Sequence, residues 1–183
     1  MHQETSEISN EELDRLVDRS LQMAIDFMAN GKQPGEALGL NQEAFNGLYA
    51  YGVRFYQSQR FTESLRVFHY LIKLQPLEAR NYKAAGASLQ GLKRYRDAAQ
   101  LYAGAVNLDM TDPEISFHAG QCFFLDRDYA PAKLALEAAV GLCDIDAQRW
   151  AGLKPRAAEL LKRVEDLISK SKAGKASGTK APL

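Results

Sequence analysis

The sequence predicts an all-α protein built from three tandem helix-turn-helix units of 34 residues each. Two observations carry this prediction. Gly52, Gly86 and Gly120 stand 34 residues apart, and the large and small residues around them return in the same register. The aligned sets are Phe61, Tyr95 and Tyr129; Ser64, Ala98 and Ala132; Phe68, Tyr102 and Leu136; Leu71, Ala105 and Ala139; and Leu74, Leu108 and Leu142. A fixed period of this length indicates stacked supersecondary units.

The small residues explain how the two helices of a unit can approach each other. Antiparallel helices come close only where one of them presents Gly or Ala. We expect the three glycines to supply this gap on the first helix of each unit. Ser64, Ala98 and Ala132 then fill the matching place on the second helix, while Phe61, Tyr95 and Tyr129 plug the space beside the turn. These positions serve packing and not catalysis.

The unit resembles the tetratricopeptide repeat. It has a small residue at its eighth place, a small residue at its twentieth and an aromatic residue at its twenty-fourth. Residues 45–78 give the fullest match, and Pro76 stands where the family places its proline. In the second unit Met110 takes the proline place, but Pro113 opens the next helix at a position where its missing N–H costs nothing.

Residues 1–40 are expected to form an N-terminal helix and a linker. Apolar residues recur every three or four positions over residues 10–30, which predicts an amphipathic helix. Ser9 and Glu12 form a candidate capping box, and Gly31 is a candidate stop. Residues 35–40 follow Pro34 and are interpreted as a linker with about one helical turn.

The repeats are expected to occupy residues 41–144, divided into units 45–78, 79–112 and 113–144, with Asn41 as a candidate cap. The predicted helices cover residues 42–58, 61–73, 79–91, 95–108, 113–125 and 129–142. A capping helix at residues 145–168, with Pro155 near its start, is expected to cover the last apolar face of the stack. Residues 169–183 are rich in Ser, Lys, Gly and Ala, which predicts a disordered tail.

Composition limits the class of protein. A chain of 183 residues with 46% hydrophobic residues suits one domain with a sizeable core. Cys122 and Cys143 fall in predicted helices and are expected to be buried, reduced thiols. The net charge is zero, and neither the acidic start nor the lysines near the end are dense enough to predict nucleic-acid binding.

No secretory leader is evident in the first residues, and no window approaches the ~20 apolar residues of a membrane span. A cytoplasmic location without membrane insertion is therefore expected. His2, His69 and His118 are scattered, and no phosphate loop or metal-ligand cluster occurs. We expect no enzyme activity, no cofactor and no metal. His118 and Cys122 stand four residues apart and are interpreted as a partly buried pair in the repeat core.

The repeat resemblance also implies a groove. In that family, places five, nine and twelve of each unit face the concave side. Here these places are Tyr49, Val53, Tyr56, Lys83, Ala87, Gln90, Phe117, Gln121 and Phe124. The aromatic share favours apolar anchors of a bound peptide. The alternative for any single ring is packing against a neighbouring helix.

A clamp for a terminal carboxylate, which some repeats of this family form, is excluded. It needs Lys with Asn or Arg on the first helices of the repeats. Tyr49 and Val53 stand where Lys and Asn are required, and Glu114 and His118 stand where Lys and Arg are required.

The arrangement as a whole resembles the class II chaperones of type III secretion systems. The likeness covers residues 9–168 and is carried by Leu48 and Tyr49, by the run FTESLRVF at residues 61–68, by residues 71–74 and by FHAGQC at residues 117–122. It implies a chaperone whose groove holds an extended segment from the N-terminal part of a translocator protein. It also implies a homodimer formed through Leu13, Leu16, Val17 and Leu21.

Two alternatives stay open. The N-terminal helix could instead dock on the first repeat of its own chain. The protein could also be another repeat adaptor, for example in pilus or secretion assembly, because the fold alone does not separate the two uses of a groove.

Overall fold

The computed structural model describes residues 15, 18–19, 22–23, 25 and 29–177, and within them it contains helices and no strand. The all-α class is therefore confirmed. The helices are α2 (Pro34–Ala37), α3 (Gln42–Gln57), α4 (Phe61–Leu74), α5 (Ala79–Gly91), α6 (Tyr95–Leu108), α7 (Pro113–Leu125), α8 (Tyr129–Ile145) and α9 (Leu153–Ser177).

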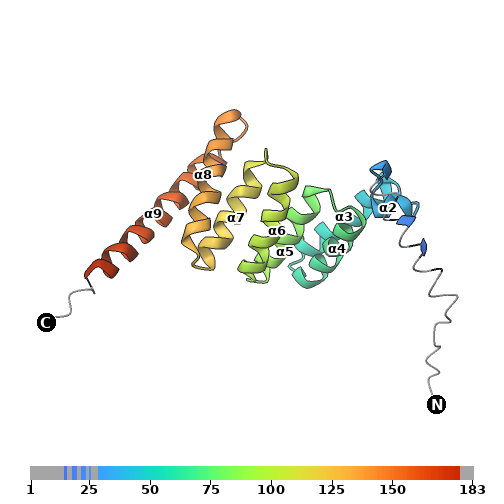
Figure 1. Cartoon of the computed structure of the whole chain (residues 1–183), viewed down its shortest axis with the longest axis horizontal. Coiled ribbons are helices and arrows are strands. Elements are labelled where there is room, and N and C mark those ends of the chain that lie inside the picture. Colours follow the sequence, from blue (N-terminus) through green and yellow to red (C-terminus); the bar gives the residue numbers. More distant parts are fainter. Residues whose placement is uncertain (1–14, 16–17, 20–21, 24, 26–28, 178–183) are drawn as a thin grey trace, which may run out of the picture.

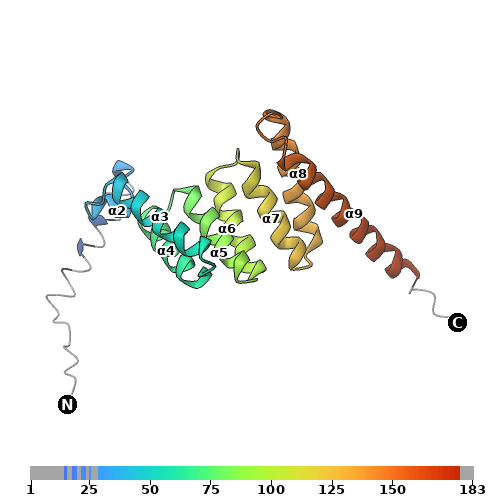
Figure 2. The same cartoon turned by 180° about the vertical axis from the view of Figure 1, so that it is seen from behind.

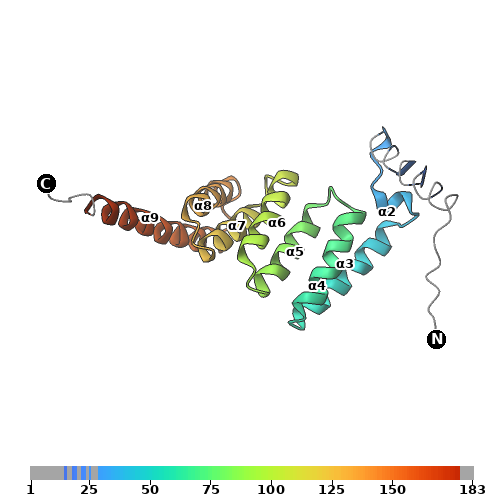
Figure 3. The same ribbon diagram turned by 60° about the horizontal axis from the view of Figure 1, so that its bottom comes forward.

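The helices form a stack that follows the order of the sequence (Figures 1 and 2). α3 packs on α4, α5 on α6 and α7 on α8, and each pair also packs on the next pair through α4 with α5 and α6 with α7. α2 contacts α4 at one end of the stack, and α9 packs on α8 and reaches α7 at the other. Figure 3 shows α9 extending along the long axis beyond the pairs.

Side chains and prolines mark where the repeat helices begin. Asn41 Oδ1 accepts a hydrogen bond from the Ala44 amide at 2.9 Å and so caps α3. Asp112 Oδ1 accepts one from the Glu114 amide at 2.8 Å, and Pro113 takes the first position of α7. The ends of α3 to α7 agree with the predicted helices to within one residue, whereas α8 continues to Ile145.

The turn inside each pair closes with a left-handed residue that is not glycine. Gln59, Lys93 and Arg127 have φ of 58°, 60° and 62°, and they too stand 34 residues apart. Side chains with a Cβ seldom adopt this conformation because the Cβ approaches the following carbonyl oxygen. Each turn therefore carries a small conformational cost at the same place in the repeat.

Lys93→Gly is expected to raise the free energy of unfolding by about 0.5–1 kcal/mol, because removing the Cβ strain of the left-handed conformation outweighs the larger chain entropy that glycine loses on folding. Lys93→Val is expected to lower it, since a β-branched residue is least tolerated at positive φ. Urea unfolding of the three proteins measures both. A glycine variant less stable than the valine variant would contradict the turn geometry.

The glycine column is the point of closest approach within each pair. A Cβ on Gly52 would lie 2.8 Å from Phe68, and one on Gly86 would lie 3.1 Å from Tyr102. At Gly120 the distance to Leu136 Cγ would be 2.6 Å. The glycines are therefore opposed by the large residues of the repeat, and the small residues of the second helix lie beside them. The hydroxyl of Ser64 accordingly donates to the Gly52 carbonyl at 3.0 Å.

The C-terminal region differs from the expectation. Residues 146–152 form a loop, and α9 starts at Leu153 and continues to Ser177, past the predicted end at residue 168. Residues 169–177, expected in a disordered tail, are helical. Burial of Leu153, Ala157 and Val164 anchors α9 in the second core cluster, and the Lys and Ala residues beyond Ile168 are good helix formers that let the helix continue.

Several expectations concern residues outside the described part of the chain. The proposed dimer positions Leu13, Leu16, Val17 and Leu21 lie there, and so do residues 178–183. The division into units also stays a prediction. Within the described residues, no helix combines the length and the apolar character needed to cross a bilayer.

Both cysteines are free and buried, as predicted. Burial raises the pKa of the Cys122 thiol to about 12 and also raises the pKa of Cys143. Both thiols therefore stay protonated and unreactive at neutral pH.

Candidate functional site

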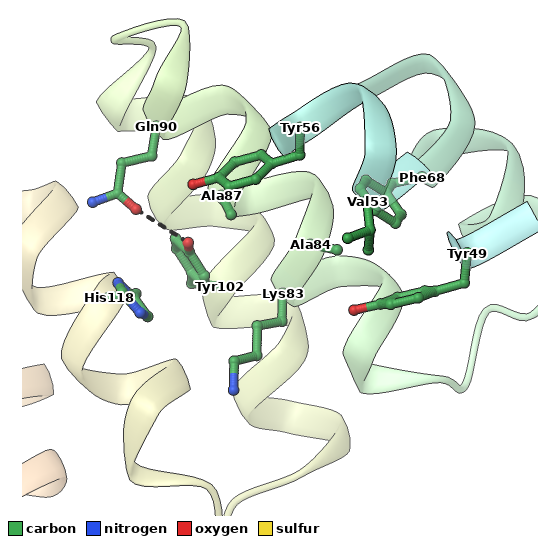
Figure 4. Close-up of a pocket in the computed structure, with 10 residues that line it drawn as sticks. All are labelled: Tyr49, Val53, Tyr56, Phe68, Lys83, Ala84, Ala87, Gln90, Tyr102 and His118. Atoms are coloured by element: carbon green, nitrogen blue, oxygen red, sulfur yellow. Dashed lines mark hydrogen bonds between the residues drawn. The ribbon is translucent and has the colours of Figure 1, made fainter. Parts of the chain in front are cut away.

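A pocket of about 270 Å³ opens among the first helices of the three pairs (Figure 4). α3, α5 and α7 supply its walls, and side chains of α4 and α6 reach it from behind. We call it the apolar pocket. Its lining residues are Tyr49, Val53, Tyr56, Phe68, Lys83, Ala84, Ala87, Gln90, Tyr102 and His118.

Helical spacing brings the wall residues to one side. Tyr49, Val53 and Tyr56 are separated by four and three residues, so they share a face of α3. Figure 4 shows them projecting toward Lys83 and Ala87 of α5. The small side chain of Ala87 leaves the space between the two helices open.

The tyrosine rings are held in place before anything binds. Tyr49 packs edge-on against Phe68 with ring centroids 5.2 Å apart, and the Arg80 guanidinium lies 5.0 Å from the Tyr49 ring centre. Tyr56 packs against Phe61 with centroids 5.4 Å apart and keeps 39% of its surface exposed. Rigid aromatic surfaces of this kind bind apolar groups at a small entropy cost.

The floor of the pocket carries a hydrogen-bonded chain. The Tyr102 hydroxyl donates to Gln90 Oε1 at 3.1 Å, and Gln90 Nε2 donates to Gln121 Oε1 at 2.7 Å. His118 stacks on Tyr102 with centroids 5.5 Å apart, and its Nδ1 has no hydrogen-bond partner in the described part of the chain. Burial lowers the pKa of His118, so the imidazole is neutral at pH 7.

Lys83 forms two ion pairs at the rim of the apolar pocket. Its Nζ lies 2.8 Å from Asp112 Oδ2 and 2.5 Å from Glu114 Oε2, which links α5 to the start of α7. Burial acts to lower the pKa of Lys83, but the two carboxylates outweigh it and raise the pKa overall. The lysine is therefore charged and neutralised by its partners, so the apolar pocket presents no free cation from this residue.

Six of the predicted groove residues line the apolar pocket together. They are Tyr49, Val53, Tyr56, Lys83, Ala87 and Gln90. The three predicted from the third unit lie elsewhere, because α9 packs against that end of the stack.

Phe117 is only 3% exposed and belongs to the core cluster that contains Leu153 and Ala157 of α9. Phe117 therefore packs against a neighbouring helix, which was the alternative stated above for any single ring of the predicted groove. Phe124 is partly buried against the same cluster, with its ring centroid 6.2 Å from that of Tyr129. Gln121 lines a second, polar pocket.

Four lining residues were not predicted: Phe68, Ala84, Tyr102 and His118. Phe68 and Tyr102 belong to the repeat column that faces the glycines, and they were interpreted as core only. Because Gly52 and Gly86 have no side chain, these rings reach the opposite side of the pair. His118 was considered for the excluded carboxylate clamp and as a partly buried partner of Cys122 in the repeat core, but not as a groove residue. The available signal in the sequence was that His118 directly follows Phe117, which was predicted to face the groove.

The second pocket, about 240 Å³, lies between α7 and α9 and is lined by Phe117, Gln121, Arg156, Glu159, Leu160 and Arg163. We call it the cationic pocket. A third, which we call the rear pocket, measures about 320 Å³ and lies among α6, α7 and α8. It uses Ser116, Ala119 and Phe123, on a different face of α7 from His118, together with Leu134, which is 68% exposed.

Across the described residues, no group of three or more His, Cys, Asp or Glu side chains is placed to hold a metal ion. The apolar pocket combines preformed rings, a few fixed hydrogen-bonding groups and a neutral floor. This combination suits the binding of apolar side chains on a flexible segment.

The fold and the pocket define a helical-repeat binding protein, and comparison with known proteins places it more closely. The tetratricopeptide repeat family matches residues 45–76, within the unit predicted as the fullest match. Low calcium response locus protein H of Yersinia pseudotuberculosis is 25% identical over 155 residues, covering 84% of this chain and 88% of that protein. Chaperone protein SicA of Salmonella typhimurium is 29% identical over 120 residues, covering 66% and 73%.

Solved structures agree. A type III secretion complex from Aeromonas hydrophila has a TM-score of 0.76 at 25% identity, covering 80% of this chain and 97% of that chain. PcrH in complex with the chaperone binding region of PopD has a TM-score of 0.68 at 28% identity, covering 71% and 97%. The predicted resemblance to the class II chaperones of type III secretion systems is confirmed by this similarity to SicA, which is named a chaperone, and to PcrH, which was solved with the chaperone binding region of PopD; none of the relatives reported above is named as an enzyme.

Proposed function

We propose that the protein is a cytosolic secretion chaperone that binds an extended N-terminal segment of type III translocator proteins. The segment lies along α3, α5 and α7, with apolar side chains in the apolar pocket. The observation that carries this proposal is the preformed aromatic wall of Tyr49 and Tyr56, in a chain similar to PcrH, which has been solved with the chaperone binding regions of PopD and PopB.

The size of the pocket supports an extended segment as the ligand. Its volume of about 270 Å³ lies just below the range of ligand pockets, which is roughly 300–1,000 Å³. A few side chains fit, whereas a folded domain does not. An extended chain can place successive side chains in such pockets while its remaining residues stay on the surface.

The chaperone effect then follows from mass action without chemistry. A translocator segment held in the groove has its apolar side chains covered and is unable to associate with other exposed apolar surfaces. The client is thereby kept soluble and apart from its partners before export. Eight of the nine predicted groove positions remain our proposed binding residues, with the six that line the apolar pocket as the main contacts. The ninth, Phe117, is buried and supports α9 instead.

A homodimer through Leu13, Leu16, Val17 and Leu21 is proposed as well. It rests on the amphipathic spacing of residues 10–30. Size-exclusion chromatography with light scattering of the full chain and of the fourfold alanine variant separates this from docking on the chain's own first repeat. If the chain dimerises through these residues, its measured mass should rise with protein concentration, whereas the mass of the variant should stay at that of the monomer.

The function is tested by purifying the tagged full chain from its source organism under secretion-repressing conditions and identifying the bound protein by mass spectrometry. We expect a translocator in a fixed ratio to the chain. Co-expression with that translocator should keep it in the supernatant after centrifugation, and expression without the chain should leave it in the pellet. Recovery of a pilus or scaffold component instead would support the repeat-adaptor alternative.

A further inference from the structure

The apolar pocket and the cationic pocket lie next to each other. Gln90, which lines the first, donates to Gln121, which lines the second, at 2.7 Å. Burial lowers the pKa of His118 in the apolar pocket, and the nearby guanidinium of Arg156 lowers it further. A segment that leaves the apolar pocket along α7 therefore meets the face of α9.

That face of α9 is positive. Arg156, Glu159 and Arg163 recur at helical spacing on one side of the helix. Arg163 is neutralised by Glu159, with the guanidinium 2.5 Å from Oε1. Arg156 makes no ion pair with any residue that the structure describes, so its guanidinium keeps its donors for another acceptor.

Arg156 is also held in position. Its guanidinium lies 5.1 Å from the ring centre of Phe117, whose side chain is buried. Stacking on an aromatic ring leaves the edge of the guanidinium plane open, and that edge is the part that binds a carboxylate through two parallel hydrogen bonds. The side chain is therefore oriented before a ligand arrives.

We propose that the cationic pocket binds an Asp or Glu side chain of the same extended segment whose apolar side chains fill the apolar pocket, with Arg156 as the residue that contacts the carboxylate. This inference rests on the proposed function and adds to it a rule for the client: apolar anchors followed along the groove by an acidic residue. The site is separate from the excluded clamp, whose positions Tyr49, Val53, Glu114 and His118 lie on α3 and α7.

The test uses short labelled peptides, amidated at the C-terminus, that tile the N-terminal part of the translocator that co-purifies with the chain. Fluorescence anisotropy first finds the bound peptide. Its acidic residue is then changed to the corresponding amide, and Arg156 is changed to Gln in the full chain. Each single change is expected to weaken binding about fivefold, and the double change no more than either alone, because both remove one interaction.

Two controls keep the result specific. Lys162→Gln removes a charge from an exposed position on the same helix, and it should leave the affinity unchanged. Arg156→Lys retains the charge and should recover part of the loss. Circular dichroism of each variant checks that the helical content of the chain is unchanged.

The outcomes separate the two levels of the proposal. If no tiled peptide binds, the proposed function fails. If a peptide binds in the apolar pocket but carries no acidic residue, or if the acidic residue and Arg156 contribute independently, the cationic pocket assignment is overturned while the proposed function stands. Binding of a peptide only when its C-terminus is a free carboxylate, and not when it is amidated, also overturns it.

Discussion

A protein carrying both Tyr49→Ala and Tyr56→Ala is expected to lose its client while keeping its helical circular dichroism. The two rings form the preformed wall of the apolar pocket. Truncation of a tyrosine that acts as a hot spot costs about 2 kcal/mol or more, so losing both, at about 4 kcal/mol, should weaken binding roughly 1,000-fold. Co-purification with the client measures the loss directly.

The matched control is the double variant Tyr51→Ala with Tyr70→Ala. Both residues are tyrosines of the first helical pair, each 53% exposed, and neither lines a pocket described above. This variant should bind the client as the unmodified chain does. Retained binding by the Tyr49 and Tyr56 variant, or equal loss in the control, would contradict the assignment of the apolar pocket.

Gly120→Ala is expected to lower the free energy of unfolding by about 1–3 kcal/mol, although alanine is the better helix former. Its Cβ would lie 2.6 Å from Leu136 Cγ and 3.2 Å from the Ala132 carbonyl oxygen. Neither atom is the free end of a flexible side chain, so α7 and α8 must move apart. Chemical denaturation measures the change.

Gly141→Ala provides the opposite expectation on the same helical pair. Within the described residues, no atom of another element lies within 4 Å of a Cβ built at this position in α8. Alanine should therefore stabilise the protein by about 0.5–1 kcal/mol through helix propensity alone.

Adding Leu136→Ala to Gly120→Ala should cost less than the sum of the two single changes, because the truncation removes the clash. Additive losses would contradict the close contact.

The repeat period was enough to predict most of the fold. Equivalent glycines and large residues 34 positions apart locate helix contacts that each unit makes in the same way, so α3 to α7 could be predicted almost to the residue. The period does not contain what happens after the last unit. α9 packs on α8 as α5 packs on α4 and α7 on α6, but residues 146–152 interrupt the 34-residue register, so the period does not give the start or the length of α9.

The same reason explains which site residues could be predicted. Tyr49, Val53 and Tyr56 face an open pocket because α5 presents the small residues Ala84 and Ala87 on its side of that pocket. Phe117 occupies an equivalent place, but α9 covers it. Arg156 was missed because α9 was interpreted only as a cap. The polar chain of Tyr102, Gln90 and Gln121 depends on side chains from three helices meeting at one point, which repeat spacing alone does not reveal.

The central claim is that the client lies on the face formed by α3, α5 and α7. The most direct measurement places the photo-crosslinking amino acid azidophenylalanine, which resembles tyrosine in shape, at Tyr56 in one protein and at Leu134 of the rear pocket in another. After irradiation with the client bound, we predict crosslinks from position 56 to the N-terminal segment of the translocator and none from position 134. Crosslinks from position 134 alone would contradict the account.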